Sequence, residues 1–279
     1  MTSGLLNSPI LLVAIGDYQP ETSAWITRTE AAGGTIPTAT KNAVDAFVVS
    51  CKAAGIFTKF KRLNLFCGSN LTACLSPLVN TIGNAMDTNT GFVSGDYSET
   101  TGLTGDGTSY LSTGLIPNTT FNYNNWHVGF YVVASTPTGK MDIGCVGHPS
   151  GNIQFRMISN YGSGTGYGVI AGDYNNNANP AFQEYGAAIT GGFFLSSRKT
   201  SSSMRVRKTN SVLNDWTDTY NGIQALPTAE FRVMSDAHAG PTSHASGGYS
   251  VGLALSDSEG ASFCSIMETF QTALTRNRG

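Results

Sequence analysis

The sequence predicts a mainly β protein in which two antiparallel sheets form a sandwich, with a helical segment before the sandwich and a helix after it. Of the 279 residues, 33 are glycine and only 12% are Asp, Glu, Lys or Arg, about half the usual share of roughly 25%. Such a composition is typical of turn-rich β proteins. The 40% of hydrophobic residues argues against a disordered chain. From about Asn80 onward, apolar residues recur with a period of two, which indicates strands.

Two helices are predicted before the strands begin. Pro20 can open a helix over residues 21–32, and Gly33 with Gly34 can close it. A second helix follows Pro37 and ends near Gly55. Its buried stripe has the i, i+3, i+4, i+7 spacing of one helix face and consists of Val44, Phe47, Val48 and Cys51. The next residues, 56–66, turn strand-like.

The central part of the chain alternates apolar and polar residues in several short segments separated by Gly, Asn and Ser. These segments are residues 109–113, 126–133, 153–157, 193–197, 204–208, 231–234 and 249–255. In the segment 204–208, Met204 and Val206 are expected to face inward, while Arg205 and Arg207 face outward. Within residues 249–255, large apolar residues alternate with small ones. The small side chains indicate a close-packed neighbour on their side of the strand. Many strands at regular spacing predict two facing sheets.

The last predicted element is a helix. Ser256 and Glu259 have the spacing of a capping box. The apolar stripe of this helix consists of Phe263, Ile266, Met267, Phe270 and Leu274. No internal repeat is evident, and a soft boundary near residues 80–90 divides the chain. We therefore expect an anchoring segment over residues 1–85 and the sandwich over residues 86–279.

Charge and cysteine content exclude several classes of protein. The formal net charge is −2, and no basic face for nucleic acid is evident. No apolar run approaches the ~20 residues of a membrane span. The apolar stretch of residues 9–15 lacks a preceding basic region, so we expect a strand or buried anchor rather than a signal peptide. The five cysteines have no CxxC spacing, which favours reduced, buried thiols made in a cytoplasm.

Several motifs resemble those of a known group of proteins. Residues 24–34, 43–47 and 55–57 look like the N-terminal module of tailed-bacteriophage and prophage virion proteins, in which that module precedes a concanavalin A-like (LamG-type) jelly-roll domain. Residues 102–114 (GLTGDGTSYLSTG) are similar to the group's early-strand signature, and residues 251–270 to its last strand and helix. Residues 204–210 also resemble the group, although Asn210 is followed by Ser211 where the group usually has glycine.

This resemblance covers the chain from about residue 21 onward. It implies a jelly-roll sandwich on a phage particle, as a tail-fibre, tail-associated or capsid-decorating protein. It implies location in the virion, contacts with other virion subunits and a homo-oligomer. It transfers no catalytic residues, because the group has no agreed ones.

The sequence contains no strong pattern for a catalytic site or a metal site. Sandwich glycosidases place two carboxyl groups close together, but Glu184, Glu230, Asp142 and Asp173 are isolated in the sequence. The four histidines form no zinc pattern. Residues 173–177 offer oxygen ligands for Ca²⁺ but lack the Glu and Gly of an EF-hand loop, so a solvated turn is favoured. We therefore expect no enzyme activity, no cofactor and no bound metal.

Two groups of residues are candidates for binding a ligand. The first combines aromatic rings with amides, which suits either sugars or a protein contact, and consists of Tyr161, Tyr167, Tyr174, Asn175, Asn176, Asn177 and Tyr185. The second is the only dense basic group and consists of Arg198, Lys199, Arg205, Arg207 and Lys208. Arg205 and Arg207 would project together toward an acidic glycan or subunit, although an ordinary solvated hairpin is favoured.

Three functions remain open at this point. The first is a non-enzymatic structural component of a tailed-phage virion. The second is an adhesin that binds host surface glycan, which is compatible with the first. The third, a polysaccharide-degrading hydrolase, has the poorest support from the residues.

Overall fold

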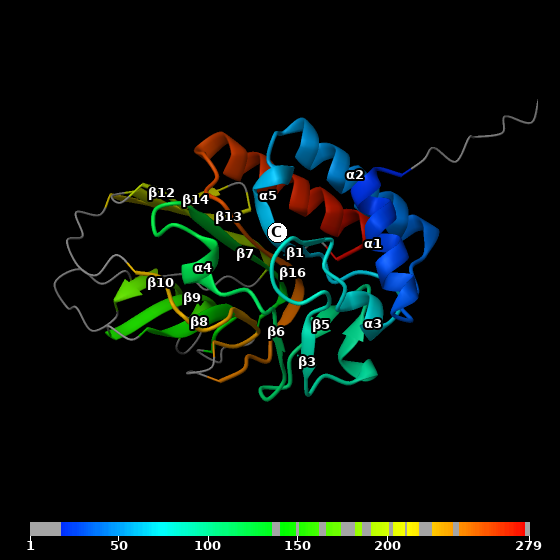
Figure 1. Cartoon of the computed structure of the whole chain (residues 1–279), viewed down its shortest axis with the longest axis horizontal. Coiled ribbons are helices and arrows are strands. Elements are labelled where there is room, and N and C mark those ends of the chain that lie inside the picture. The colour runs from blue at the N-terminus through cyan, green and yellow to red at the C-terminus, as the bar shows by residue number, and fades with distance from the viewer. Residues whose placement is uncertain are drawn as a thin grey trace, which may run out of the picture.

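Two antiparallel sheets, one of nine strands and one of seven, lie face to face in the computed structural model (Figure 1). The predicted sandwich is confirmed. The structure describes residues 18–135, 140–148, 151–161, 166–173, 182–185, 191–200, 203–209, 211–217, 225–236 and 240–276.

The larger sheet contains strands from both ends of the chain. In spatial order its main path is β14 (Ser211–Thr217), β13 (Ser203–Lys208), β12 (Gly192–Thr200), β7 (Trp126–Ala134), β16 (Ala245–Gly252), β1 (Phe60–Asn64) and β2 (Val79–Asn80). Beside this path, β5 (Gly102–Thr104) pairs with β16, and β4 (Tyr97–Ser98) pairs with β5.

The smaller sheet comes mostly from the middle of the chain. Its order is β11 (Phe182–Tyr185), β10 (Gly166–Asp173), β9 (Gly151–Tyr161), β8 (Ile143–His148), β15 (Arg232–Val233), β6 (Tyr110–Ser112) and β3 (Thr88–Thr90). Long strands at the β9–β10 end give way to strands of two or three residues at the other end.

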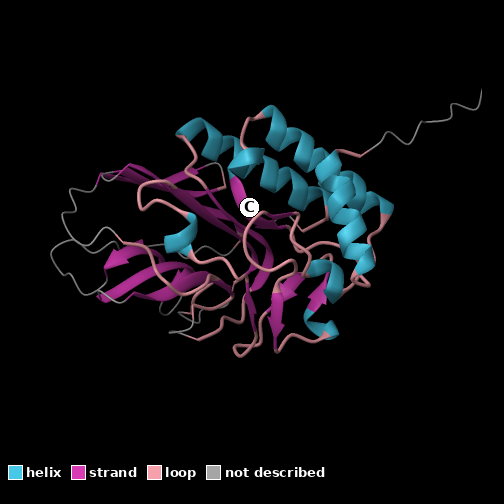
Figure 2. Cartoon of the chain, in the orientation of Figure 1, coloured by secondary structure: helices cyan, strands magenta, loops and turns pink. Residues whose placement is uncertain are grey.

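Three long helices cover the outer face of the larger sheet (Figure 2). They are α1 (Pro20–Ala31), α2 (Thr38–Ala53) and α5 (Asp257–Ala273). Shorter helical turns are η1 (Phe57–Lys59), α3 (Leu71–Cys74), η2 (Ser94–Asp96) and α4 (Pro117–Thr120). The predicted helices at both ends are confirmed, including the buried stripe of α2 and the capping box of Ser256 with Glu259 at the start of α5.

The larger sheet therefore separates two hydrophobic cores. In β7, Trp126, Val128, Phe130 and Val132 belong to the core between the sheets. Tyr131 and Val133 of the same strand belong to the core beneath the helices. As predicted, odd and even positions face opposite sides, and every residue from 126 to 133 is buried. A strand buried on both faces is the reason for the nearly continuous apolar run of this segment.

Of the small residues predicted to meet a close neighbour, Gly252 of β16 does so, and Gly248, just before the predicted segment, is equally close-packed. Gly248 has a φ of +142°, and a Cβ on it would lie 2.5 Å from the carbonyl oxygen of Asn64. A Cβ on Gly252 would lie 2.5 Å from Cε1 of His127. Any larger side chain at these two positions would push β16 away from β1 or from the ring of His127.

A buried ion pair joins β1, β16 and the segment before β3. The side chains of Arg62 and Asp87 are fully buried. Nη2 of Arg62 donates to Oδ1 of Asp87 at 2.6 Å, and the Tyr249 hydroxyl donates to the same oxygen at 2.7 Å. Nδ2 of Asn64 donates to Oδ2 of Asp87 at 2.7 Å. Burial and the neighbouring Asp87 carboxylate hold the pKa of Tyr249 well above its ordinary value.

A second buried cation, Arg276, fixes the chain just after the end of α5. Arg276 is fully buried and donates to four main-chain carbonyl oxygens. Its guanidinium reaches Leu65 at 2.7 Å, Phe66 at 2.9 Å, and Glu99 and Gly247 at 3.1 Å. Burial lowers the pKa of Arg276, and the four carbonyl dipoles offset the loss of solvation of this cation.

The two parts of the predicted domain division share the larger sheet. β1 pairs with β16 along residues 60–64, and α2 packs against α5. The division at residue 85 stays a prediction.

The five cysteines are buried free thiols, namely Cys51, Cys67, Cys74, Cys145 and Cys264. Within the described part of the chain, no helix has both the length and the apolar character to cross a membrane.

Replacing Arg62 with Met should lower the free energy of unfolding by about 3–5 kcal/mol, because Asp87 is left buried without its cation. Urea unfolding measures the change. The control is Lys41→Met, which removes the cation paired with the half-exposed Glu30 and should cost less than about 1 kcal/mol. Equal losses in the two variants would contradict the role given to the buried pair.

The buried His127 predicts a dependence of stability on pH. Burial lowers the pKa of His127 to about 4, despite a 2.6 Å hydrogen bond between Nδ1 and the carbonyl of Leu253. An unfolded histidine titrates near ~6.5. Between these values the unfolded chain binds a proton that the folded chain does not, so the free energy of unfolding falls as the pH falls.

We expect a loss from this group of up to about 3 kcal/mol between pH 6.5 and pH 4. His127→Gln, measured by urea unfolding across the same range, should show a shallower pH dependence than the wild type. An unchanged slope would contradict the assignment.

Candidate functional site

The predicted basic group lies on the hairpin of β12 and β13, where strand alternation divides it between two faces. Arg198 is 2% exposed and lies 4.3 Å over the ring of Tyr123, next to the core between the sheets. Arg205 and Arg207 point to the opposite face, toward α5. The expectation of an ordinary solvated hairpin is therefore wrong for Arg198 and Arg207, which are both buried.

The physical reason is the first turn of α5, which covers the outer face of this hairpin (Figure 1). Nη2 of Arg207 donates to the carbonyl oxygen of Asp257 at 3.1 Å. Gly260, one turn later, lies against the same side chain, and a Cβ on it would make an ordinary van der Waals contact with Nε of Arg207 at 3.4 Å. Met204 and Val206 face inward as predicted, and Arg205 and Arg207 do face away from them.

A polar pocket opens where the hairpin meets the start of α5, and we call it the α5 pocket. Its volume is about 460 Å³, and its lining consists of Ser197, Lys199, Ser203, Arg205, Leu255, Ser256, Asp257 and Ser258. This volume lies within the ~300–1,000 Å³ of small-molecule sites. Seven of the eight residues are polar, so the pocket suits a ligand rich in hydrogen-bonding groups.

Hydrogen bonds fix the floor of the α5 pocket. The Ser197 hydroxyl accepts from the backbone N–H of Leu255 at 2.9 Å and donates to its carbonyl at 3.0 Å, which joins β12 to the chain entering α5. The Glu259 carboxylate accepts from the N–H of Ser256 at 2.7 Å and from Lys59 at 2.6 Å. Burial opposes the ionisation of Glu259, but the hydrogen bonds from Lys59 and Ser256 hold its pKa below the ordinary value.

The charged groups of the α5 pocket face its opening. Arg205 forms an ion pair with Asp257, and the side chains are 22% and 65% exposed respectively. Lys199, Ser203 and Ser258 are exposed. The hydroxyls of Ser256 and Ser258 lie 3.3 Å apart. The pocket mouth therefore presents cationic donors, an acidic acceptor and serine hydroxyls. All of them lie on a rigid junction between a strand and a helix.

Three of the predicted aromatic residues, Tyr161, Tyr167 and Tyr185, lie on strands of the smaller sheet, away from the α5 pocket. Tyr161 is the last residue of β9, and Tyr167 of β10 lies opposite Tyr185 of β11 in the register. The side chains of these three tyrosines lie outside the described residues, as do Tyr174 and residues 175–177 entirely. Ligand binding at these positions, and a solvated turn rather than a calcium site at residues 173–177, stay predictions.

One cluster has the residue types of a hydrolase triad without its geometry. Ser159, His244 and Asp142 are fully buried. The Ser159 hydroxyl lies 3.1 Å from Nδ1 of His244, and Oδ1 of Asp142 lies 2.6 Å from the same nitrogen. A triad needs serine and carboxylate on opposite ring nitrogens. This cluster therefore joins β9 to the chain before β16 and does not have the geometry in which Asp142 orients His244 as a base for Ser159.

Two of the carboxylates considered for hydrolysis hold the backbone. Asp142 also accepts from the backbone N–H of Ser159. Glu230 accepts from the N–H of Gly114 at 2.8 Å. The side chains of Glu184 and Asp173 lie outside the described part. Within that part, no three His, Cys, Asp or Glu residues form a group that could hold a metal ion.

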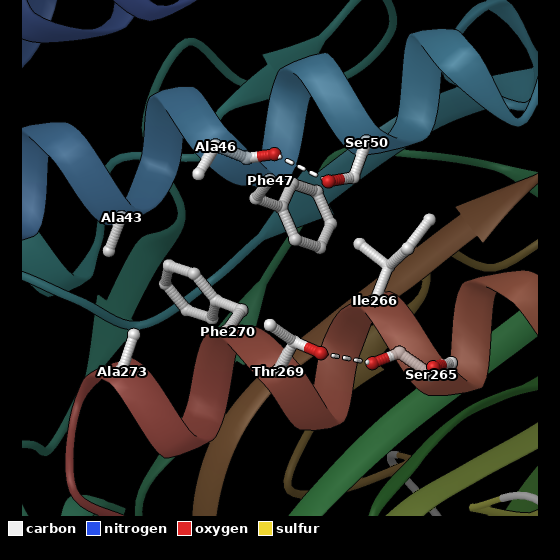
Figure 3. Close-up of a pocket in the computed structure, with 9 residues that line it drawn as sticks. All are labelled: Ala43, Ala46, Phe47, Ser50, Ser265, Ile266, Thr269, Phe270 and Ala273. Atoms are coloured by element: carbon white, nitrogen blue, oxygen red, sulfur yellow. Dashed lines mark hydrogen bonds between the residues drawn. The ribbon is translucent and has the colours of Figure 1, made fainter.

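A second hollow lies between α2 and α5, and we call it the α2–α5 groove (Figure 3). Its volume is about 130 Å³, and its lining consists of Ala43, Ala46, Phe47, Ser50, Ser265, Ile266, Thr269, Phe270 and Ala273. The Ser50 and Thr269 hydroxyls donate to Ala46 and Ser265 of their own helices at 2.8 and 2.9 Å. Because these hydroxyls are turned back to the backbone, the groove presents mainly carbon and no ionisable group.

The comparisons with known proteins concern the fold. No family model and no curated protein match the chain. One similar solved structure is domain 4 of AbnA, a GH43 extracellular arabinanase from Geobacillus stearothermophilus, in complex with arabinotriose. It matches with a TM-score of 0.52 and 13% identity over 68% of this chain and 92% of that domain.

A second similar structure is a mutant Trypanosoma rangeli sialidase displaying trans-sialidase activity. Its TM-score is 0.52 at 13% identity, over 91% of this chain and 38% of the sialidase. The chain thus spans well under half the length of that enzyme. At such low identity the two likenesses support the β-sandwich and carry no site residue over.

Proposed function

We propose that this chain is a non-catalytic carbohydrate-binding module and that the α5 pocket receives the sugar. The observation that carries the proposal is the pocket itself, in which seven polar residues surround about 460 Å³ on a rigid strand–helix junction. Sugars present many hydroxyls, each able to donate and accept. The pocket lining combines serine hydroxyls with an arginine, a lysine and a carboxylate. These groups can both donate hydrogen bonds to the sugar hydroxyls and accept hydrogen bonds from them.

The rigidity of the site favours binding over catalysis. The Ser197 bridge to Leu255 and the capping box of α5 fix the floor before any ligand arrives. A preformed site loses little conformational entropy when it binds. Asp257 is the one carboxylate in the pocket lining, and it is paired with Arg205, whereas glycoside hydrolysis generally needs two carboxyl groups flanking the bond.

The fold likeness adds limited support to this proposal. The arabinanase domain was solved with arabinotriose, so a similar sandwich is associated with a saccharide. The proposal for this chain rests on its own pocket, because at 13% identity the sugar-contacting residues cannot be transferred.

Filling the α5 pocket should abolish saccharide binding. Ser258→Trp places an indole at an exposed position on the pocket rim. For a saccharide found by glycan array, we expect calorimetric affinity to fall at least about tenfold, equivalent to about 1.4 kcal/mol. The matched control is Thr272→Trp, exposed on the same helix outside the pocket, which should bind as the wild type does.

Two results would overturn this assignment. Binding that survives Ser258→Trp but disappears in Tyr174→Ala or Asn175→Ala would move the site to the aromatic and amide residues. Release of reducing ends from the bound polysaccharide would show an enzyme instead of a binding module.

We propose in addition that the module is displayed on a tailed-phage particle, the role implied by the sequence resemblance. The observation that favours this role is the α2–α5 groove, whose uncharged carbon surface suits a lasting contact with an apolar segment of a neighbouring particle subunit. Val49, on α2, adds an apolar side chain that is 46% exposed. The groove and the α5 pocket have separate linings, so one surface can hold the module while the other binds sugar.

A charge in the groove should prevent incorporation into particles. Ala46→Glu places a carboxylate on this exposed apolar wall, and co-sedimentation with purified particles should fall at least tenfold while saccharide binding is kept. Ala31→Glu, an exposed alanine on α1, is the matched control and should be incorporated normally. Normal incorporation of Ala46→Glu would contradict this use of the groove.

A further inference from the structure

We infer that the saccharide bound in the α5 pocket is anionic and that its acidic group replaces the carboxylate of Asp257 on Arg205. This inference rests on the proposed function, since it names the class of ligand for the same site. The net charge of the whole chain is −2, so a locally positive pocket is a departure from the average surface.

The charges around the pocket favour an anion. Lys199, Arg205 and Arg207 line the pocket or its inner end, against the single carboxylate of Asp257. Asp215 lies opposite Arg205 in the register of β13 and β14. The side chain of Asp215 lies outside the described residues, and among the described side chains of the pocket cations outnumber carboxylates by three to one. Glu259 adds nothing to the balance, because it is paired with Lys59.

The helix adds to this positive potential. The pocket includes the first turn of α5, a helix of 17 residues. The N-terminus of a helix carries the equivalent of roughly +0.5 charge. Arg207 is buried beneath the pocket and donates to the carbonyl of Asp257, so its charge lies close to the site at a fixed position.

Asp257 has the properties of a replaceable partner. Its side chain is 65% exposed, whereas Arg205 is only 22% exposed. An ion pair with a largely solvent-exposed partner contributes little to stability, so breaking the Arg205–Asp257 pair costs little. A ligand carboxylate can then form a charge-assisted pair with Arg205, while the hydroxyls of Ser203 and Ser258 face the sugar ring. Neutral sugars gain nothing from displacing Asp257.

The test compares a glucuronic acid-bearing oligosaccharide with its neutral glucose counterpart by calorimetry. Asp257→Asn should tighten binding of the acidic ligand about threefold or more, because the competing carboxylate is gone. Lys199→Gln, at an exposed position, and Arg205→Gln should each weaken it, Arg205→Gln by at least tenfold. Arg232→Gln, on the smaller sheet, is the matched control and should leave both affinities unchanged.

The outcomes separate this inference from the proposed function. If both oligosaccharides bind equally and lose affinity together in Ser258→Trp, the pocket binds sugar but the inference of an anionic ligand is wrong. Weaker binding of the acidic ligand by Asp257→Asn would assign Asp257 to the sugar hydroxyls and would also overturn the inference. If neither these ligands nor any acidic or neutral saccharide on an array binds the wild type, the proposed function falls as well.

Discussion

Every residue of β7 from position 126 to position 133 is buried. This burial on both faces of the strand decides which surfaces of the molecule a ligand can reach. One face of the larger sheet packs on the smaller sheet and the other lies beneath α1, α2 and α5. A ligand therefore cannot reach the broad faces of the larger sheet in the described part of the chain. It can reach places where the covering helices end or diverge, and the α5 pocket and the α2–α5 groove are two such places in the described part of the chain.

Buried polar anchors keep these covering elements in register. The Arg62–Asp87 pair ties β1 to β16 through Tyr249, and Arg276 ties the end of α5 to four carbonyls from three other segments. Such groups are costly to bury unless fully hydrogen-bonded. Their geometry therefore fixes one arrangement of α5 on the sheet, and with it the position of the pocket at the other end of the same helix.

Most of the fold could be predicted from local patterns. Periods of 3.6 and 2 marked the helices and the strands, and the Ser256–Glu259 spacing marked the start of α5. The site could not be predicted in the same way, because α5 meets the β12–β13 hairpin through contacts about 50 residues apart in the chain. Arg205 and Arg207 were candidates for ligand binding, whereas Asp257, Ser258 and Ser203 carried no signal beyond a capped helix and a turn. The covering helix is also why Arg207, expected to face solvent, is buried.

The central claim is that sugar binds in the α5 pocket. A crystal structure with a bound acidic oligosaccharide tests this claim most directly. The account predicts density between Arg205 and Lys199 at the first turn of α5, with the Asp257 side chain turned away from Arg205. Density confined to the β9–β10 end of the smaller sheet, with the Arg205–Asp257 pair intact, would contradict it.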